Sequence, residues 1–517
     1  MNIKKEKFIF FAVFLCVLAA SFLTALHCLK YDMLIFDDYF SPYGRTFFTP
    51  EHGRYTASYL NHILIECLPE IFNIHPNDFQ NIAASPLKII VMIICFLYLA
   101  GSAFVFSKKN DNDFLKLPIF NPAFILIYAV IFLVLFNDFY FFTDKKSYFN
   151  IFENTVFWEY SASIVLYIIF AGILGVYFVK KEAFSKFGYT VLLISTFFLG
   201  ISIEVLNLPA LVLLCFLGIY LFIKKEFDRK YALLFIVYTA SLLCYYAAGN
   251  DHEPVYSEPF NLYFIHNIIP FLKGFFKFAA AEYSALLIPI LVLFIVILFI
   301  SRHQKQTSAR FLFFTASGIF SFLIFFAAMF SAGYLNGDTG IYWYSYDKFI
   351  YVCKTILLFY LLFTLSFLLD SGKINNNISC SIKVLLCICV LAVFHKNLIT
   401  DYYKNINNTV QYYKAVKTAA YKAEKYAIES EGDVIKLPKL FKPLTRELNL
   451  SDGICGFGGY IQNVHPEIKK TEIKFRRKLN TGVTFSEKEL EELKFSNLLK
   501  HKMHRHKKDF NDCNRNK

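Results

Sequence analysis

The fold class of this chain is decided by the stretch FIFFAVFLCVLAASFLTALHCL, residues 8–29, which contains no Asp, Glu, Lys or Arg. A helix needs about 20 apolar residues to cross a hydrocarbon core about 30 Å thick, so the stretch predicts a membrane span. The basic residues 1–7 precede it as in a signal peptide, but the apolar run exceeds the usual length of about 7–15 residues. No small-x-small cleavage site follows, which favours an uncleaved first span.

Apolar runs of the same kind recur along the 517-residue chain, which is 56% hydrophobic and only 18% charged. A soluble protein carries about 25% charged residues, and here the charges are concentrated between the uncharged runs. We predict an all-α polytopic membrane protein with about 11 transmembrane helices, in a membrane domain of residues 1–399. The further predicted spans are residues 87–106, 119–142, 155–179, 189–206, 208–223, 231–248, 284–300, 311–331, 349–369 and 384–399.

Two neighbouring runs, 189–206 and 208–223, share one apolar stretch that Glu204, Asn207 and Pro209 interrupt. Basic clusters lie at both outer ends of this stretch. Cytoplasmic loops are enriched in Lys and Arg, so both clusters are expected on one side of the membrane. A hairpin satisfies this expectation, whereas a single overlong helix does not.

The loop charges also predict the orientation of the whole chain. The loops on the amino-terminal side carry most of the basic residues, so we expect a cytoplasmic amino terminus. The net charge of +13 therefore reflects membrane orientation, and no base-stacking motif indicates a nucleic-acid partner. Loop 30–86 and the acidic residues of the other long loops fall on the outer face.

Several regions lie outside the predicted spans, and some of them are expected to have structure of their own. In the first outer loop, residues 30–86, apolar residues recur at helical spacing from Tyr59 to Phe72, which predicts an interfacial amphipathic helix that ends near Pro69. Residues 260–281 are either a second such helix or a plain loop packed on the bundle. Residues 400–500 are expected to form a small α/β extramembrane domain, with a helix at 402–431, a strand at 433–438 and a helix at 487–500. Residues 501–517 form a basic tail that we expect to be disordered.

The chain carries no recognised soluble-enzyme or metal motif. Its 12 cysteines lie mostly in apolar segments and include no Cys-x-x-Cys pair, so they read as small buried apolar residues. There is no Walker loop, dinucleotide fingerprint, zinc-binding His-Glu-x-x-His or nucleophile elbow. We therefore predict no metal site and no cofactor. The sequence does not decide whether the protein needs a divalent cation.

Asp37 and Asp38 follow the first span directly and begin a polar, aromatic-rich loop that runs on through Arg54. An acidic pair held at the membrane surface can act as a general base or a cation ligand for a lipid-borne substrate. Two solvated loop carboxylates would give the same pattern. The sequence alone leaves both interpretations open.

The order and sidedness of several short motifs resemble those of GT-C type membrane glycosyltransferases, in particular bacterial relatives of the O-antigen glucosyltransferases. The resemblance is carried by Phe36-Asp37-Asp38-Tyr39, Gly53-Arg54-Tyr55, the segment from Glu153 to Trp158, Glu204, and Ala248-Gly249-Asn250. The Trp-Trp-Asp-Tyr-Gly block of the oligosaccharyltransferases is absent. The resemblance implies an inverting transfer from a polyprenyl-phosphate sugar to a glycan or lipid acceptor, on the outer face of the bacterial inner membrane.

The resemblance also assigns roles to residues. It places the base in the first loop, as Asp37 or Asp38, and Arg54 is the expected phosphate partner because a guanidinium binds two oxygens at once. A salt bridge to Glu51 would explain Arg54 equally well. The other expected substrate-binding residues, each of which also has an ordinary interpretation as an interfacial or loop side chain, are Glu204, Trp158, Glu159, Asn250, His252 and Lys273.

Three other functions compete with the glycosyltransferase. A transporter or flippase of a lipid-linked or small polar substrate would bind near the midplane between broken helices, whereas the charges here cluster at one surface. An O-antigen-polymerase-like enzyme would use arginines of the outer loops, where only Arg45 and Arg54 occur between predicted spans. A non-catalytic relative that keeps the fold is the last alternative.

Overall fold

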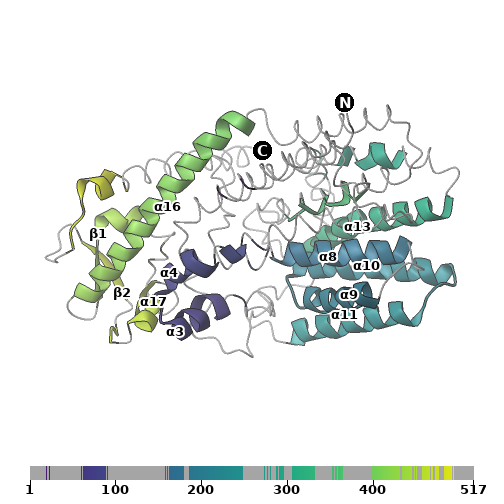
Figure 1. Ribbon diagram of the computed structural model, residues 1–517, viewed down its shortest axis with the longest axis horizontal. Helices are drawn as coiled ribbons and strands as arrows, with labels where there is room; N and C mark the ends of the chain where they lie inside the picture. The colour runs from purple at the N-terminus through teal and green to yellow at the C-terminus, as the bar shows by residue number, and fades with distance from the viewer. Residues whose placement is uncertain are drawn as a thin grey trace, which may run out of the picture.

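The computed structural model describes the chain in several stretches, most of them helical (Figure 1). Of the predicted spans, 119–142 lies outside the described residues, and 8–29, 87–106 and 384–399 lie almost wholly outside them, as does the tail 501–517. The described residues, with short gaps inside some ranges, are 60–90, 158–179, 186–247, 287–295, 305–331, 352–364, 398–444 and 448–493, and the isolated positions 19, 23, 273, 276 and 280.

Five long helices lie side by side in a bundle (Figure 1). They are α8 (Ala162–Val179), α9 (Lys186–Gly200), α10 (Glu204–Ile223), α11 (Arg229–Ala247) and α13 (Lys305–Ser331). Helix α8 packs against α9, α10 and α13, while α11 covers α9 and also contacts α10. Among the described residues, Ala162–Val179 and Val205–Ile223 form helices that are long and apolar enough to cross a membrane.

The hairpin predicted between the two adjoining apolar runs is confirmed. The Tyr231 hydroxyl donates to the Leu214 carbonyl (2.6 Å) and the Tyr238 hydroxyl to the Asn207 carbonyl, so α10 and α11 are antiparallel. The Tyr189 hydroxyl donates to the Lys230 carbonyl (2.7 Å), which pairs the amino-terminal ends of α9 and α11. Helix α9 therefore runs opposite to α10.

The break in this hairpin lies earlier than the sequence indicated, at residues 201–203. The side chain of Ser202 donates to the Leu199 carbonyl (2.7 Å), and the amide of Asn207 donates to the Ser202 carbonyl (3.3 Å). These bonds satisfy carbonyls that the end of α9 leaves without helical partners. Asn207 is therefore a capping residue inside α10, and Glu204 is the first residue of that helix.

The basic ends of these helices are fastened together by polar contacts. Asp228 accepts hydrogen bonds from the Tyr177 hydroxyl (3.0 Å) and from the backbone of Tyr231 (2.8 Å), and Arg310 pairs with Glu226. The contacts bring together the carboxy-terminal end of α8, the α10–α11 turn and the first turns of α13. These three helix ends therefore lie at the same end of the bundle.

The carboxy-terminal region combines one long helix with two short strands. Its elements are α16 (Leu398–Glu429), β1 (Val434–Pro438), the 3-10 helix η11 (Lys439–Leu444), α17 (Phe457–Val464) and β2 (Glu472–Arg476). The strands pair in parallel, from Val434 opposite Glu472 to Pro438 opposite Arg476. The predicted strand is present as β1, whereas β2 and α17 were not predicted. A helix begins where expected, at residue 487.

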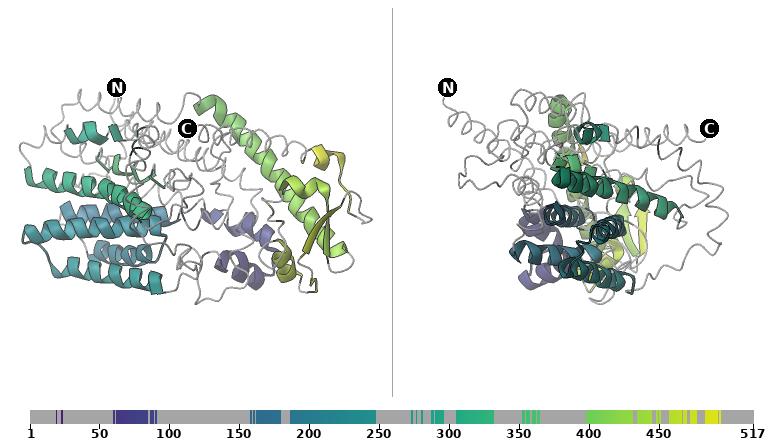
Figure 2. Two further views of the ribbon diagram at one scale, coloured as in Figure 1. Left: turned by 180° about the vertical axis from the view of Figure 1, so that it is seen from behind. Right: turned by 90° about the vertical axis from the view of Figure 1, so that its right-hand side faces the viewer.

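The described part of the first loop forms two short helical segments, which lie between the bundle and the carboxy-terminal region (Figures 1 and 2). The first consists of the π-helical turn η3 (Ile63–Cys67) and α3 (Leu68–Phe72), and it ends at Asn73 in the left-handed conformation (φ 50°). The second consists of α4 (Pro76–Phe79) and η4 (Gln80–Ala84). The predicted helix is thus present through Phe72, and the second segment was not predicted.

Candidate functional site

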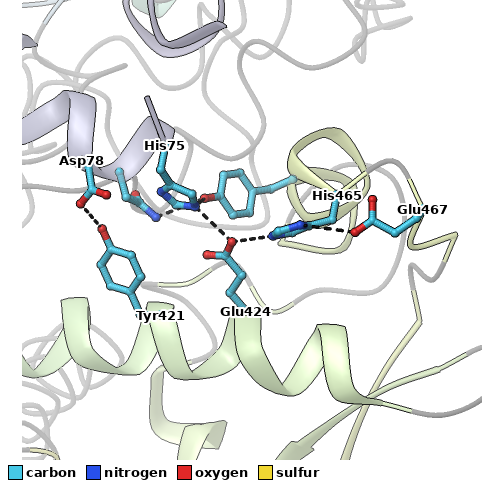
Figure 3. A network of polar contacts seen from close by, with 8 residues as sticks. His75, Asp78, Tyr421, Glu424, His465 and Glu467 are labelled. Atoms are coloured by element: carbon cyan, nitrogen blue, oxygen red, sulfur yellow. Dashed lines mark hydrogen bonds and ion pairs between the residues drawn. The ribbon is translucent and has the colours of Figure 1, made fainter. Parts of the chain in front are cut away.

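A cluster of polar side chains joins the first loop to the carboxy-terminal region (Figure 3). Glu424 of α16 lies at its centre. The Nε2 atoms of His75 and His465 both face the same carboxylate oxygen, Oε1 of Glu424, at 3.1 Å and 2.7 Å. His75 and Glu424 are 349 positions apart in the sequence, so this is a contact that only the fold creates.

Local sequence explains how each histidine reaches the cluster. His75 precedes Pro76, and a residue before proline is driven to extended backbone, as its φ of −55° and ψ of 131° show. Its carbonyl accepts hydrogen bonds from the backbones of Asp78 (2.9 Å) and Phe79 (3.0 Å), so it starts α4. His465 follows α17 directly, and its backbone N–H donates to the carbonyl of Ile461 (2.8 Å).

A second row of contacts surrounds the histidines. The hydroxyl of Tyr460 lies 3.4 Å from Nε2 of His75 and accepts a hydrogen bond from the amide of Asn77 (3.2 Å). One helical turn before Glu424, Tyr421 donates a hydrogen bond to Asp78. Residues three apart share one helix face, which is why Tyr421 and Glu424 both reach the first loop.

The electrostatics of the cluster depend on the central carboxylate. Burial on its own would raise the pKa of Glu424, but the hydrogen bonds and positive charge of His75 and His465 outweigh it and lower the pKa from its ordinary value. For Tyr421, burial, together with the hydrogen bond to Asp78, raises the pKa far above neutral pH. At neutral pH Glu424 is therefore an anion and Tyr421 a neutral donor.

His465 lies between two carboxylates. Its Nε2 is 2.7 Å from Oε1 of Glu424, while its Nδ1 lies 3.6 Å from Oε1 of the exposed Glu467, beyond hydrogen-bonding distance. By contrast, Nδ1 of His75 and Oε2 of Glu424 are buried and have no hydrogen-bond partner within the described residues.

This arrangement can hold and release protons, and it can tie two distant segments together. No group of three His, Cys, Asp or Glu side chains within the described residues is arranged to hold a metal ion. The chemistry that the cluster offers is therefore that of a carboxylate shared between two imidazoles.

Comparison with known proteins adds no assignment. No protein-family model matches this sequence, and no curated protein matches it. The interpretation of the site therefore rests on the residues themselves.

The structure describes only some of the predicted site residues. Trp158 is 1% exposed and packs within the hydrophobic core, so its ring has no open face for a sugar in this conformation. Lys273 is an exposed helical residue, and Glu204 begins α10. The remaining predicted residues, which lie outside the described part of the chain, are Asp37, Asp38, Arg54, Glu159, Asn250 and His252.

Sequence reasoning missed the cluster of His75, Glu424 and His465. A signal for it does exist, because both histidines occur in the same short motif, Asn73-Ile74-His75-Pro76 and Asn463-Val464-His465-Pro466. In both copies an imidazole stands directly before a proline. Nothing in the sequence indicates that the two copies meet at Glu424.

Proposed function

We propose that this protein is a GT-C type membrane glycosyltransferase, which transfers a sugar from a polyprenyl-phosphate donor to a glycan or lipid acceptor on the outer face of the bacterial inner membrane. The observation that supports this most is the packing of the first loop against the carboxy-terminal region beside the helix bundle (Figure 1). A lipid-linked substrate needs such a covered site next to the bilayer, where water is limited.

Exposed apolar side chains support the membrane location of the bundle. Helices α9, α10 and α11 expose Phe197, Phe198, Ile219, Phe222 and Leu243. Monomeric soluble proteins rarely expose large contiguous apolar patches, whereas lipid-facing helices must. Together with the two helices of the described part of the chain that are long enough to span, this surface favours a bundle embedded in lipid.

The contacts of His75 support the proposed sidedness. Because His75 bonds to Glu424 and Tyr460, the first loop and the carboxy-terminal region lie on the same side of the membrane. The chain must then cross the membrane an even number of times between residues 90 and 398. The predicted spans that follow the first loop are even in number, so the charge-based orientation and this contact agree.

Asp37 or Asp38 would take the proton of the acceptor hydroxyl as it attacks the anomeric carbon of the donor. The bond from that carbon to the phosphate oxygen breaks, and the polyprenyl phosphate leaves with the bonding electrons. Adjacent carboxylates near low dielectric repel each other, which raises the pKa of one and makes it a better base. Arg54 would balance the charge of the departing phosphate.

A transfer assay on the purified protein in sealed vesicles tests this function. We expect polyprenyl-phosphate glucose and a lipid-linked acceptor, supplied to the outer face, to give a glycosylated acceptor and free polyprenyl phosphate. Vesicles without the protein are the control. If the donor instead reaches the opposite leaflet unmodified, and no acceptor is glycosylated, the transporter or flippase function replaces the transferase.

Labelling of introduced cysteines by a membrane-impermeant maleimide tests the sidedness separately. Ser41→Cys in the first loop and Lys425→Cys on the exposed face of α16 are expected to react from outside intact cells. Lys181→Cys, in a predicted cytoplasmic loop, should react only after permeabilisation. Wild-type protein gives the background from native cysteines. Labelling of Lys425→Cys only after permeabilisation would contradict the shared side.

A further inference from the structure

We propose that His75, Glu424 and His465 form a proton-operated clasp, which holds residues 75–80 on the carboxy-terminal region under mildly acidic conditions and loosens when the imidazoles lose their charge. The clasp concerns how two parts of the protein are held together, and it does not depend on which reaction the protein performs.

The position of Glu424 makes the junction sensitive to charge. Its side chain is only 9% exposed, and one oxygen faces both imidazoles. A buried carboxylate is costly unless positive charge compensates it, and hydrogen bonds between ions are about twice as strong as neutral ones. Charged His75 and His465 therefore attach the first loop firmly, whereas neutral imidazoles leave a buried anion with weaker partners.

Protons can reach the clasp without unfolding the protein. The side chains of His75 and His465 are 23% and 24% exposed, so both imidazoles exchange protons with water. Nδ1 of His75 and Oε2 of Glu424 are buried without a hydrogen-bond partner within the described residues.

The other ionisable groups around the clasp come from every element packed on it. The further acidic groups are Asp78 of α4, which accepts a hydrogen bond from Tyr421, and Glu467, whose Oε1 lies 3.6 Å from Nδ1 of His465. Tyr421 and Tyr460 act as hydroxyls, and for Tyr421 burial raises the pKa well beyond neutral pH. Lys422, on the same helix as Glu424, is directed to the Thr484 carbonyl and to Glu489, away from the central carboxylate.

The direction of the pH response follows from these groups. The contribution of Glu424 is present above about pH 4.5 and is lost as the pH falls through its lowered pKa. The attraction between Glu424 and the two imidazoles requires charged imidazoles, so it is present in acid and is lost once they are neutral. The clasp is therefore tightest in mildly acidic solution.

Hydrogen exchange of the full-length protein in lipid nanodiscs measures how firmly the clasp holds the first loop, through the protection of its backbone amides. After correction for the intrinsic effect of pH, protection of the backbone amides of residues 75–84 is expected to fall about fivefold to tenfold between pH 6 and pH 8. Peptides from α10 serve as an internal reference and should keep constant protection. Flat protection of residues 75–84 across this range in the wild-type protein would overturn the proposal without need of any variant.

Variants test whether the pH dependence of amide protection arises from His75, Glu424 and His465. His465→Gln, which keeps a polar side chain but cannot be charged, should remove most of the pH dependence of protection. Glu424→Gln should give weak protection at both pH values. His62→Gln is the matched control, because His62 pairs with Glu66 (2.6 Å) within the first loop and should leave the pH dependence intact. Wild-type pH dependence in His465→Gln and Glu424→Gln would refute the clasp.

Discussion

Replacing Asp37 and Asp38 together with asparagine is expected to lower the rate of sugar transfer at least about 100-fold, because positioned general bases contribute about 10²–10⁴. Asparagine has nearly the same size and can still hydrogen-bond, but it cannot accept the proton of the acceptor hydroxyl. The measurement is the initial rate of release of polyprenyl phosphate by protein purified in vesicles. Equal amounts of inserted protein must be compared.

The matched control is the double change Asp111→Asn and Asp113→Asn, which removes two nearby carboxylates from a predicted cytoplasmic loop. It should retain the wild-type rate, since that loop faces away from the proposed site. If the Asp37 and Asp38 double variant transferred sugar at the wild-type rate, the base would have to lie elsewhere. The single variants then distinguish which carboxylate acts, because only the true base should reproduce the full loss.

The sequence predicted those parts of the fold that depend on local pattern. Apolar run length and the basic flanks located α8 and the hairpin formed by α9 and α10, because both signals lie within a few tens of residues. The break itself was misplaced, since Asn207 looks like an interruption in the sequence but in the structure donates to Ser202 from inside α10. Side-chain capping of this kind depends on geometry that composition does not record.

The candidate site could not be predicted in the same way. Its contacts join residues as far apart as 385 positions, as between His75 and Tyr460, and no local periodicity brings such residues together. The strand β2 was missed for a related reason, because a five-residue parallel strand acquires its identity from pairing with β1. By contrast, the long helix α16 was predicted nearly in full from its own residues.

Replacing Glu424 with leucine is expected to lower the free energy of unfolding of the carboxy-terminal region by about 3 kcal/mol at pH 6, because removing one member of a buried charged group leaves its partners uncompensated. Leucine fills a similar volume, so the loss comes mainly from two imidazoles left without their shared carboxylate. Pulse proteolysis of the full-length protein along a urea series measures this change. The control is Glu467→Leu, because Glu467 also contacts His465 but is 69% exposed. An exposed pair contributes about 1 kcal/mol or less.

Measuring the free energies of unfolding of wild type and Glu424→Leu at several pH values distinguishes a contribution of charge from one of packing. As the pH falls below about 4.5 and through the lowered pKa of Glu424, the wild-type protein loses the stability that its carboxylate supplies. The difference in free energy of unfolding between wild type and Glu424→Leu, called the gap below, should therefore narrow. The gap should narrow again at high pH, because His75 and His465 then carry no charge for the carboxylate to compensate. A gap of constant size from pH 4 to pH 9 would mean that Glu424 contributes only by filling space. A maximum in mildly acidic solution would instead tie the stability of this region to the same protons that hold the first loop in place.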